Sequence, residues 1–238
     1  MSTTESLPPS VLQRRLRPID ERAIPDGLVL HEIYASIQGE STHAGRPCTF
    51  IRTTGCHLRC GYCDTPHAFT EGRAWTLRDI RAEVDRLGVP LVELTGGEPL
   101  LQPNVLPLMT DLCDAGYTVL LETSGSIDFG AVDPRVVKIV DIKTPSSGEH
   151  AHNRVDLAAA LLPHDEIKLV IGSRDDYAWA RELIAEHHLA ERCTVLLGPV
   201  FGAVEPREVA AWILADRLPV RLQIQLHKVL WDPRARGV

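Results

Sequence analysis

Short apolar runs alternate with segments of helical periodicity over most of this chain, and this alternation limits the folds open to it. The runs are rich in Val, Ile and Leu and show little polar alternation, which is typical of strands buried on both faces. The expected strands cover 48–54, 91–95, 117–122, 137–142, 166–171, 194–198 and 220–226. Strands and helices in alternation predict parallel pairing through right-handed crossovers, and therefore an α/β fold.

Helical segments fill the intervals between these runs. In TLRDIRAEVDRLG, apolar residues recur at helical spacing between a capping residue, Thr76, and a stop, Gly88. Further helices are expected within 104–116, 173–189 and 205–218. About six parallel strands are fewer than the eight of a closed barrel, so we expect a partial, open β/α barrel. A doubly wound flat sheet is the alternative.

The length of 238 residues suits one large domain, which we place at 28–238. Residues 1–27 are rich in Ser, Thr, Pro and charge, and predict a flexible N-terminal extension with at most a short helix near 11–17. The net charge of −7, without clustered Lys or Arg, argues against a nucleic-acid partner. No apolar run approaches the roughly 20 residues of a membrane span, and no signal peptide is recognisable, so we expect a cytoplasmic protein without a membrane partner.

Polar residues cluster where the expected strands stop. TGGEP covers 95–99, ETSG 122–125, DIKTP 141–145, GPVFG 198–202 and QLHK 225–228. Each alone could be a tight turn or a helix cap. In barrels and open parallel sheets, however, ligands bind at the carboxyl ends of the strands. The recurrence of such residues at several strand ends therefore predicts one shared pocket.

Three of the six cysteines, Cys56, Cys60 and Cys63, lie within eight residues after the first expected strand. In a reducing compartment such a group indicates metal ligands or catalysis before disulfides. A disulfide uses two cysteines and a closed zinc site usually four ligands, whereas three thiolates suit an iron–sulfur cluster that keeps one iron open. A zinc site completed by His57 or His67, or an incidental group of thiols, is the alternative.

The spacing in CHLRCGYC is the signature of the radical S-adenosylmethionine (SAM) enzymes, and the resemblance extends further. EIYASIQGES, GRPCTFIRTTGCHLRCGYCDT, ELTGGEPLLQ, LETSGS, VDIKTPSSG and QLHKVLW, in this order, resemble the 7-carboxy-7-deazaguanine synthase family from about residue 29 to 231. A glycyl-radical enzyme activase shares the cysteine motif and GGEP but would not need SIQGE or His227. A non-catalytic zinc module is the third hypothesis. Ser41 and His57 depart from the family's usual Gly and Asn, and the tail after Trp231 runs past its usual end.

The resemblance implies a radical SAM lyase that converts 6-carboxy-5,6,7,8-tetrahydropterin to 7-carboxy-7-deazaguanine with loss of ammonia. This reaction belongs to the biosynthesis of 7-deazapurines such as queuosine. The implied cofactors are a [4Fe–4S] cluster, SAM and Mg2+. The implied partners are a flavodoxin or ferredoxin as electron donor and a second copy of the chain in a homodimer.

Carried over position by position, the resemblance also assigns roles. The residues expected to take part in catalysis are the cluster ligands Cys56, Cys60 and Cys63, and Thr65, whose hydroxyl would bind Mg2+. Residues expected to contact SAM are Tyr62, Cys63, Asp64, Gly97, Glu98, Ser124, Asp141, Ile142 and Lys143. Residues expected to contact the pterin are Ile37, Gln38, Gly39, Glu40, Arg52, Thr95 and His227.

Overall fold

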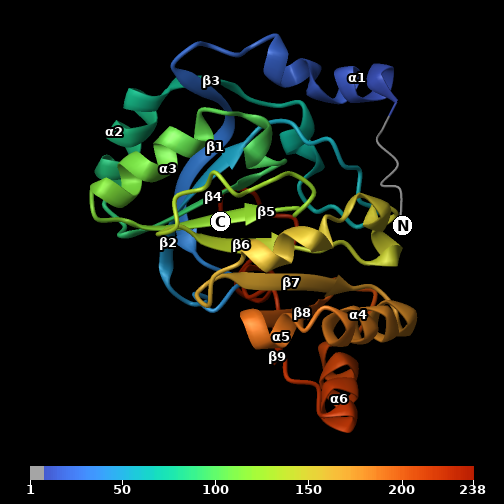
Figure 1. The fold of residues 1–238 in the computed structure, drawn as a ribbon. Coiled ribbons are helices and arrows are strands. Elements are labelled where there is room, and N and C mark those ends of the chain that lie inside the picture. The colour runs from blue at the N-terminus through green and yellow to red at the C-terminus, as the bar shows by residue number, and fades with distance from the viewer. Residues whose placement is uncertain (1–7) are drawn as a thin grey trace.

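The structure, a computed structural model, describes residues 8–238 as one mixed sheet with helices packed against it (Figure 1). The order of the strands across the sheet is β3-β1-β2-β4-β5-β6-β7-β8-β9. Their bounds are β1 Gly27–Ile37, β2 Pro47–Thr53, β3 Arg73–Thr76, β4 Leu91–Gly96, β5 Thr118–Thr123, β6 Val137–Asp141, β7 Glu166–Ile171, β8 Thr194–Pro199 and β9 Arg221–Leu222.

Strands β2 and β4–β9 pair in parallel with one another, whereas β1 pairs antiparallel with both β2 and β3. The sheet ends at β3 on one side and β9 on the other, so it does not close. This mostly parallel, open sheet confirms the predicted fold class. Six of the seven expected strands match β2 and β4–β8 to within about two residues.

The helices follow the expected caps. Helix α2 (Leu77–Leu87) begins after Thr76, whose hydroxyl accepts from the Asp79 amide, and ends at Gly88 in the left-handed region (φ 66°). The hydroxyl of Ser173 caps α4 (Arg174–Glu186) in the same way. The remaining helices are α1 Pro9–Asp20, α3 Val105–Asp114, α5 Leu189–Arg192, α6 Pro206–Asp216 and α7 His227–Leu230, and short 3-10 turns include η1 Pro66–Phe69 and η2 Pro99–Leu101.

Alternate residues of the central strands face two different environments. In β4, Val92 and Leu94 belong to the main core, against which α2, α3 and α4 also pack, while Glu93 and Thr95 line a pocket. In β7, Leu169 belongs to that core and Lys168 lines the pocket. The helices therefore cover one face, and the opposite face carries polar side chains near the carboxyl ends of the strands.

Two parts of the sheet differ from the sequence prediction. Strands β1 and β3 were not expected, and the strand predicted at 220–226 is limited to Arg221–Leu222. The strand ends at Leu222, and the side chains that follow bond to the segment after β1: Gln223 accepts from the Ser41 amide, and Gln225 donates to Glu40.

The predicted N-terminal extension, 1–27, falls partly on a helix. Residues 9–20 form α1, which is longer than the short helix expected there, and residues 1–7 lie outside the described part of the chain. Arg15 of α1 donates to the backbone oxygen of His57, and Ile19 is buried. Flexibility of this segment stays a prediction. Within residues 8–238, no helix combines the length and apolar character that a membrane crossing requires.

Candidate active site

Segments that follow the strands of the parallel sheet line one pocket on its polar face. Of the residues predicted to bind ligands, the pocket is lined by Ile37, Gln38, Gly39, Glu40, Arg52, Cys56, Cys60, Tyr62, Cys63, Asp64, Thr65, Thr95, Gly97, Ser124, Asp141, Lys143 and His227. Glu98 and Ile142 are buried outside this lining. Segments that are more than 180 residues apart in the sequence thus meet at the predicted rim.

The loop that carries the three cysteines is held by backbone contacts. Gly55 donates its amide to Ala68 at 2.8 Å and accepts from the Glu98 amide at 2.9 Å. An added Cβ at Gly97 would overlap the Gly55 carbonyl oxygen, so only glycine allows the GGEP turn to approach the loop this closely. The GGEP motif therefore positions the cysteine loop in addition to lining the pocket.

All three cysteines in the loop are free thiols. Burial raises the pKa of Cys56 to about 12 and also raises the pKa values of Cys60 and Cys63. These groups become thiolates when a metal replaces the proton. Among the described residues, their sulfurs do not form a group compact enough to bind one single ion. A cluster that offers a different iron to each sulfur needs no such convergence, so the loop fits an iron–sulfur cluster.

Glu98 joins the GGEP segment to the ETSG segment. Its carboxylate is buried and accepts from the Ser124 amide at 2.8 Å, the Ser124 hydroxyl at 2.6 Å and the Thr123 hydroxyl at 2.9 Å. Burial raises the pKa of Glu98 despite these hydrogen bonds. Contact between Glu98 and SAM stays a prediction, and in the structure this side chain fixes Ser124 in the pocket wall.

Lys168, a buried lysine that the sequence analysis did not identify, pairs with three carboxylates in the pocket. Lys168 Nζ lies 2.8 Å from Glu40 Oε2 and 3.3 Å from Asp141 Oδ2, and it also pairs with Glu122. Burial by itself lowers the pKa of Lys168, but the three carboxylates raise it well above its ordinary value, so the ammonium stays charged. The sequence did contain an indication of this role, because a lysine inside the apolar run EIKLVI would be buried and a buried charge requires partners.

Glu40 and Glu93 line the same pocket, and their pKa values are shifted in opposite directions. Burial alone would raise the pKa of Glu40, but Lys168 and a hydrogen bond from Gln225 hold it below its ordinary value. Burial and the nearby Glu122 raise the pKa of Glu93 well above its ordinary value, although Gln38 donates to it. The two environments thus shift the pKa values of these acids in opposite directions. Sequence reasoning found Glu40 and missed Glu93 and Glu122.

Two predicted residues already have protein partners. Arg52 Nε donates to Glu32 Oε1 at 2.8 Å, and Arg52 Nη2 donates to the Tyr34 hydroxyl at 2.9 Å. The Thr65 hydroxyl donates to Asp64 Oδ1 at 2.9 Å, so its oxygen lone pairs remain available. The guanidinium of Arg52 therefore offers only part of its donors to a ligand.

The C-terminal segment closes part of the pocket. His227 packs against Gly39, where an added Cβ would overlap its ring, and the Leu226 amide donates to the Gly39 oxygen at 2.9 Å. The last residues also contribute to the wall, and the C-terminus marked in Figure 1 belongs to it. These residues are Asp232, Pro233, Ala235, Arg236, Gly237 and Val238. The tail after Trp231, whose role the sequence left open, is thus part of the site.

Comparisons with known proteins agree with this geometry. The model of the radical SAM superfamily matches residues 50–140, which include the cysteine loop and the GGEP and ETSG segments. A 7-carboxy-7-deazaguanine synthase of Chlorobaculum tepidum is 50% identical over 214 residues, covering 89% of this chain and 97% of the relative. Another of the same name from Koribacter versatilis is 46% identical, covering 87% of this chain and 98% of the relative.

A solved structure is also similar over nearly the whole chain. The crystal structure of QueE from Escherichia coli matches with a TM-score of 0.68 and 25% identity. The match covers 84% of this chain and 95% of that one.

Proposed function

This chain belongs to the 7-carboxy-7-deazaguanine synthase family of radical SAM enzymes, and we propose that it catalyses the reaction for which those relatives are named. The substrate is 6-carboxy-5,6,7,8-tetrahydropterin, and the products are 7-carboxy-7-deazaguanine and ammonia. One observation carries the proposal: the cysteine loop, the GGEP and ETSG segments, the SIQGE segment and His227 all line a single pocket. The proposal requires that a cluster, SAM and a pterin meet in one place.

The family implies a [4Fe–4S] cluster and SAM, and the residues of the loop fit both. Cys56, Cys60 and Cys63 would each bind one iron of the cluster. When bound, the cluster supplies the electron that splits SAM and so starts the radical chemistry. On the protein side, Ser124 and the ion pair between Lys143 and Asp141, with 3.0 Å between Nζ and Oδ2, line the wall beside the cysteines. Lys143 suits the SAM carboxylate as a compact cation.

The pterin would bind on the other side of the same pocket. A pterin edge presents donors and acceptors next to one another, and Glu40, held as a carboxylate by Lys168, suits its N–H groups. Burial and Glu122 raise the pKa of Glu93 in the same pocket, and when protonated this side chain would donate to an acceptor of the pterin. Lys168 contacts both Glu40 and Asp141, so one cation links the proposed pterin side to the proposed SAM side. These residues bind and orient the substrate and exclude water from it.

We also propose that Thr65 binds Mg2+ through its hydroxyl oxygen. Magnesium prefers oxygen ligands and usually shares them with substrate groups. A substrate carboxylate could complete the shell and be polarised there. Ring contraction of the pterin would then occur with its carboxylate fixed.

Three further parts of the proposal concern the surroundings of the enzyme. A flavodoxin or ferredoxin would supply the electron, and the enzyme would work in the cytoplasm. Two copies would form a homodimer, and exposed apolar residues next to the open sheet edge at β9 supply a surface for it. These are Leu222, Ile224, Val229 and Leu230, the last two 67% and 51% exposed.

The direct test is turnover under strictly anaerobic conditions. Reconstituted protein is mixed with reductant, SAM and the carboxy-tetrahydropterin, and the deazaguanine product is followed by its absorbance and mass. We expect product from the wild type and none from Cys60→Ala, with iron loading lost and the circular dichroism spectrum retained. SAM cleavage without any conversion of the pterin would favour an activase, and bound zinc without iron or sulfide would favour a zinc module.

A further inference from the structure

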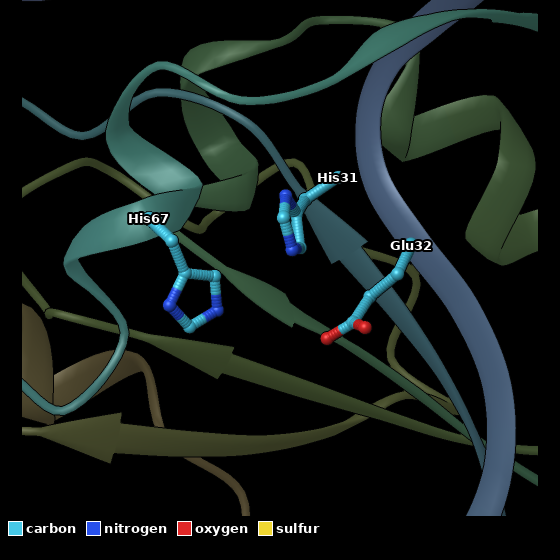
Figure 2. A group of neighbouring side chains, drawn as sticks. All are labelled: His31, Glu32 and His67. Carbon is cyan, nitrogen blue, oxygen red and sulfur yellow. The ribbon is translucent and has the colours of Figure 1, made fainter. Parts of the chain in front are cut away.

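Beside the cysteine loop, two imidazoles and one carboxylate converge (Figure 2). His31 and Glu32 belong to β1, and His67 belongs to η1. One ligand atom from each lies within 4.8 Å of the other two, and Figure 2 shows the side chains directed toward one another. A single ion bound at about 2.0–2.2 Å from each ligand would need only small side-chain movements from this arrangement.

An irregularity in β1 brings the two consecutive donors together. In an unbroken strand, His31 and Glu32 would point to opposite faces of the sheet. The pairing with β2 shifts between Leu30, which is opposite Thr53, and Glu32, which is opposite Arg52, so His31 is an extra residue. A β-bulge of this kind redirects side chains and is common near functional sites.

Neighbouring groups support the ligands without occupying all of their donor atoms. Arg52 Nε holds Glu32 Oε1 at 2.8 Å, as second hydrogen bonds commonly orient ligating carboxylates, and this leaves Oε2 for an ion. His31 Nδ1 is buried and finds no hydrogen-bond partner among residues 8–238. The Glu71 carboxylate lies 3.9 Å from this nitrogen and supplies a second negative charge nearby.

We propose that His31, Glu32 and His67 bind one Zn2+ ion or a related divalent transition-metal ion. Two imidazoles and a carboxylate are a donor set typical of zinc, whereas Mg2+ prefers oxygen ligands alone. The site is distinct from the cysteine-bound cluster and from the Mg2+ position proposed at Thr65. Glu32 and His67 also line the pocket, so an ion bound to them would lie at its wall.

Such an ion would tie two separate elements together. Its ligands come from β1 and from η1, which directly follows the cysteine loop. Occupancy would therefore hold the C-terminal end of this loop against the sheet. The positive charge of Arg52, beside Glu32, repels a divalent cation. We therefore expect weaker zinc binding than at a closed structural zinc site.

The test counts zinc in the cluster-loaded enzyme, in which iron already occupies the thiolates. Anaerobic protein is dialysed against micromolar Zn2+ in the presence of millimolar Mg2+, and zinc and iron are then measured by mass spectrometry. We expect about one zinc per chain in the wild type, with iron unchanged. His31→Gln and His67→Gln should each weaken zinc binding at least ten-fold, whereas His188→Asn, an exposed histidine at a left-handed position, should not.

A wild type that retains no zinc, or variants that retain as much as the wild type, would overturn the proposal. If a variant fails to load its cluster, anomalous diffraction at the zinc edge on wild-type crystals decides the matter. A peak among His31, Glu32 and His67 supports the proposal, and zinc bound only at other residues refutes it.

Discussion

Lys168 Nζ and Glu40 Oε2 lie 2.8 Å apart although 128 residues separate them in the sequence. Lys168 is on β7 and Glu40 follows β1, so this ion pair joins the parallel half of the sheet to its antiparallel end. The same ammonium pairs with Glu122 and Asp141. The pocket is therefore built around one buried cation and three acidic partners.

Replacing this cation should damage both the fold and the reaction. Lys168→Met leaves Glu40, Glu122 and Asp141 without their shared partner, and we expect the free energy of unfolding to fall by about 3–5 kcal/mol. Turnover should be lost as well. The measurement is denaturant unfolding of the anaerobic protein together with the turnover assay. Arg86→Met, which removes an exposed pair with Glu83, should change neither quantity. Unchanged unfolding of Lys168→Met would show that the network contributes little.

The approach of the GGEP turn to the cysteine loop is sterically tight. Gly97→Ala would drive a Cβ into the Gly55 carbonyl oxygen, so the loop must move, and we expect less iron per chain and a lower unfolding temperature. Gly202→Ala is the matched control. No atom of residues 8–238 lies within 4 Å of its Cβ, and its positive φ of 78° costs only about 1 kcal/mol. Equal iron contents in the two variants would contradict the packing described.

The protein should lose stability on the acidic side partly through His57. Burial and neighbouring cations lower the pKa of His57 to about 4, whereas the unfolded chain has the ordinary value near 6.5. Below pH 6.5 the unfolded state therefore binds the proton more readily. The stability that neutral His57 contributes is full above this pH and is lost as the pH falls toward 4. We expect His57→Asn to show a smaller drop in unfolding temperature between pH 7 and pH 5 than the wild type. Parallel curves would refute the assignment.

The Mg2+ response should depend on the hydroxyl of Thr65. Thr65→Ala removes the proposed oxygen ligand, so the Mg2+ concentration for half-maximal stimulation of turnover should rise several-fold. Thr70→Ala, an exposed position five residues later, should leave it unchanged. A Thr65→Ala enzyme with the wild-type Mg2+ response would remove this residue from the site.

The strands that could be predicted from the sequence are those with a continuous apolar run. Apolar runs such as LVELT and TVLLG correspond to β4 and β8, and capping by Thr76 and Ser173 locates two helices. Strand β1 was missed because it is only half-buried over much of its length and contains the bulge at His31. A bulge adds one residue to a strand and so breaks the two-residue alternation on which strand prediction from sequence depends.

The site was predictable where a motif names a residue and unpredictable where only the fold brings residues together. Three sequence motifs were enough to predict segments that line the pocket: CHLRCGYC, GGEP and SIQGE. Lys168, Glu93 and Glu122 belong to three different strands, and their relation depends on the register of the sheet. Even so, a charge within each apolar run was a usable signal, since a buried charge implies a partner.

The central claim is that the three cysteines leave one iron open, so that SAM binds to it directly. Electron paramagnetic resonance of the reduced, reconstituted protein tests this claim with and without SAM. We predict that SAM changes the signal of the [4Fe–4S] cluster in the wild type. A spectrum that stays the same when SAM is added in excess would contradict the account.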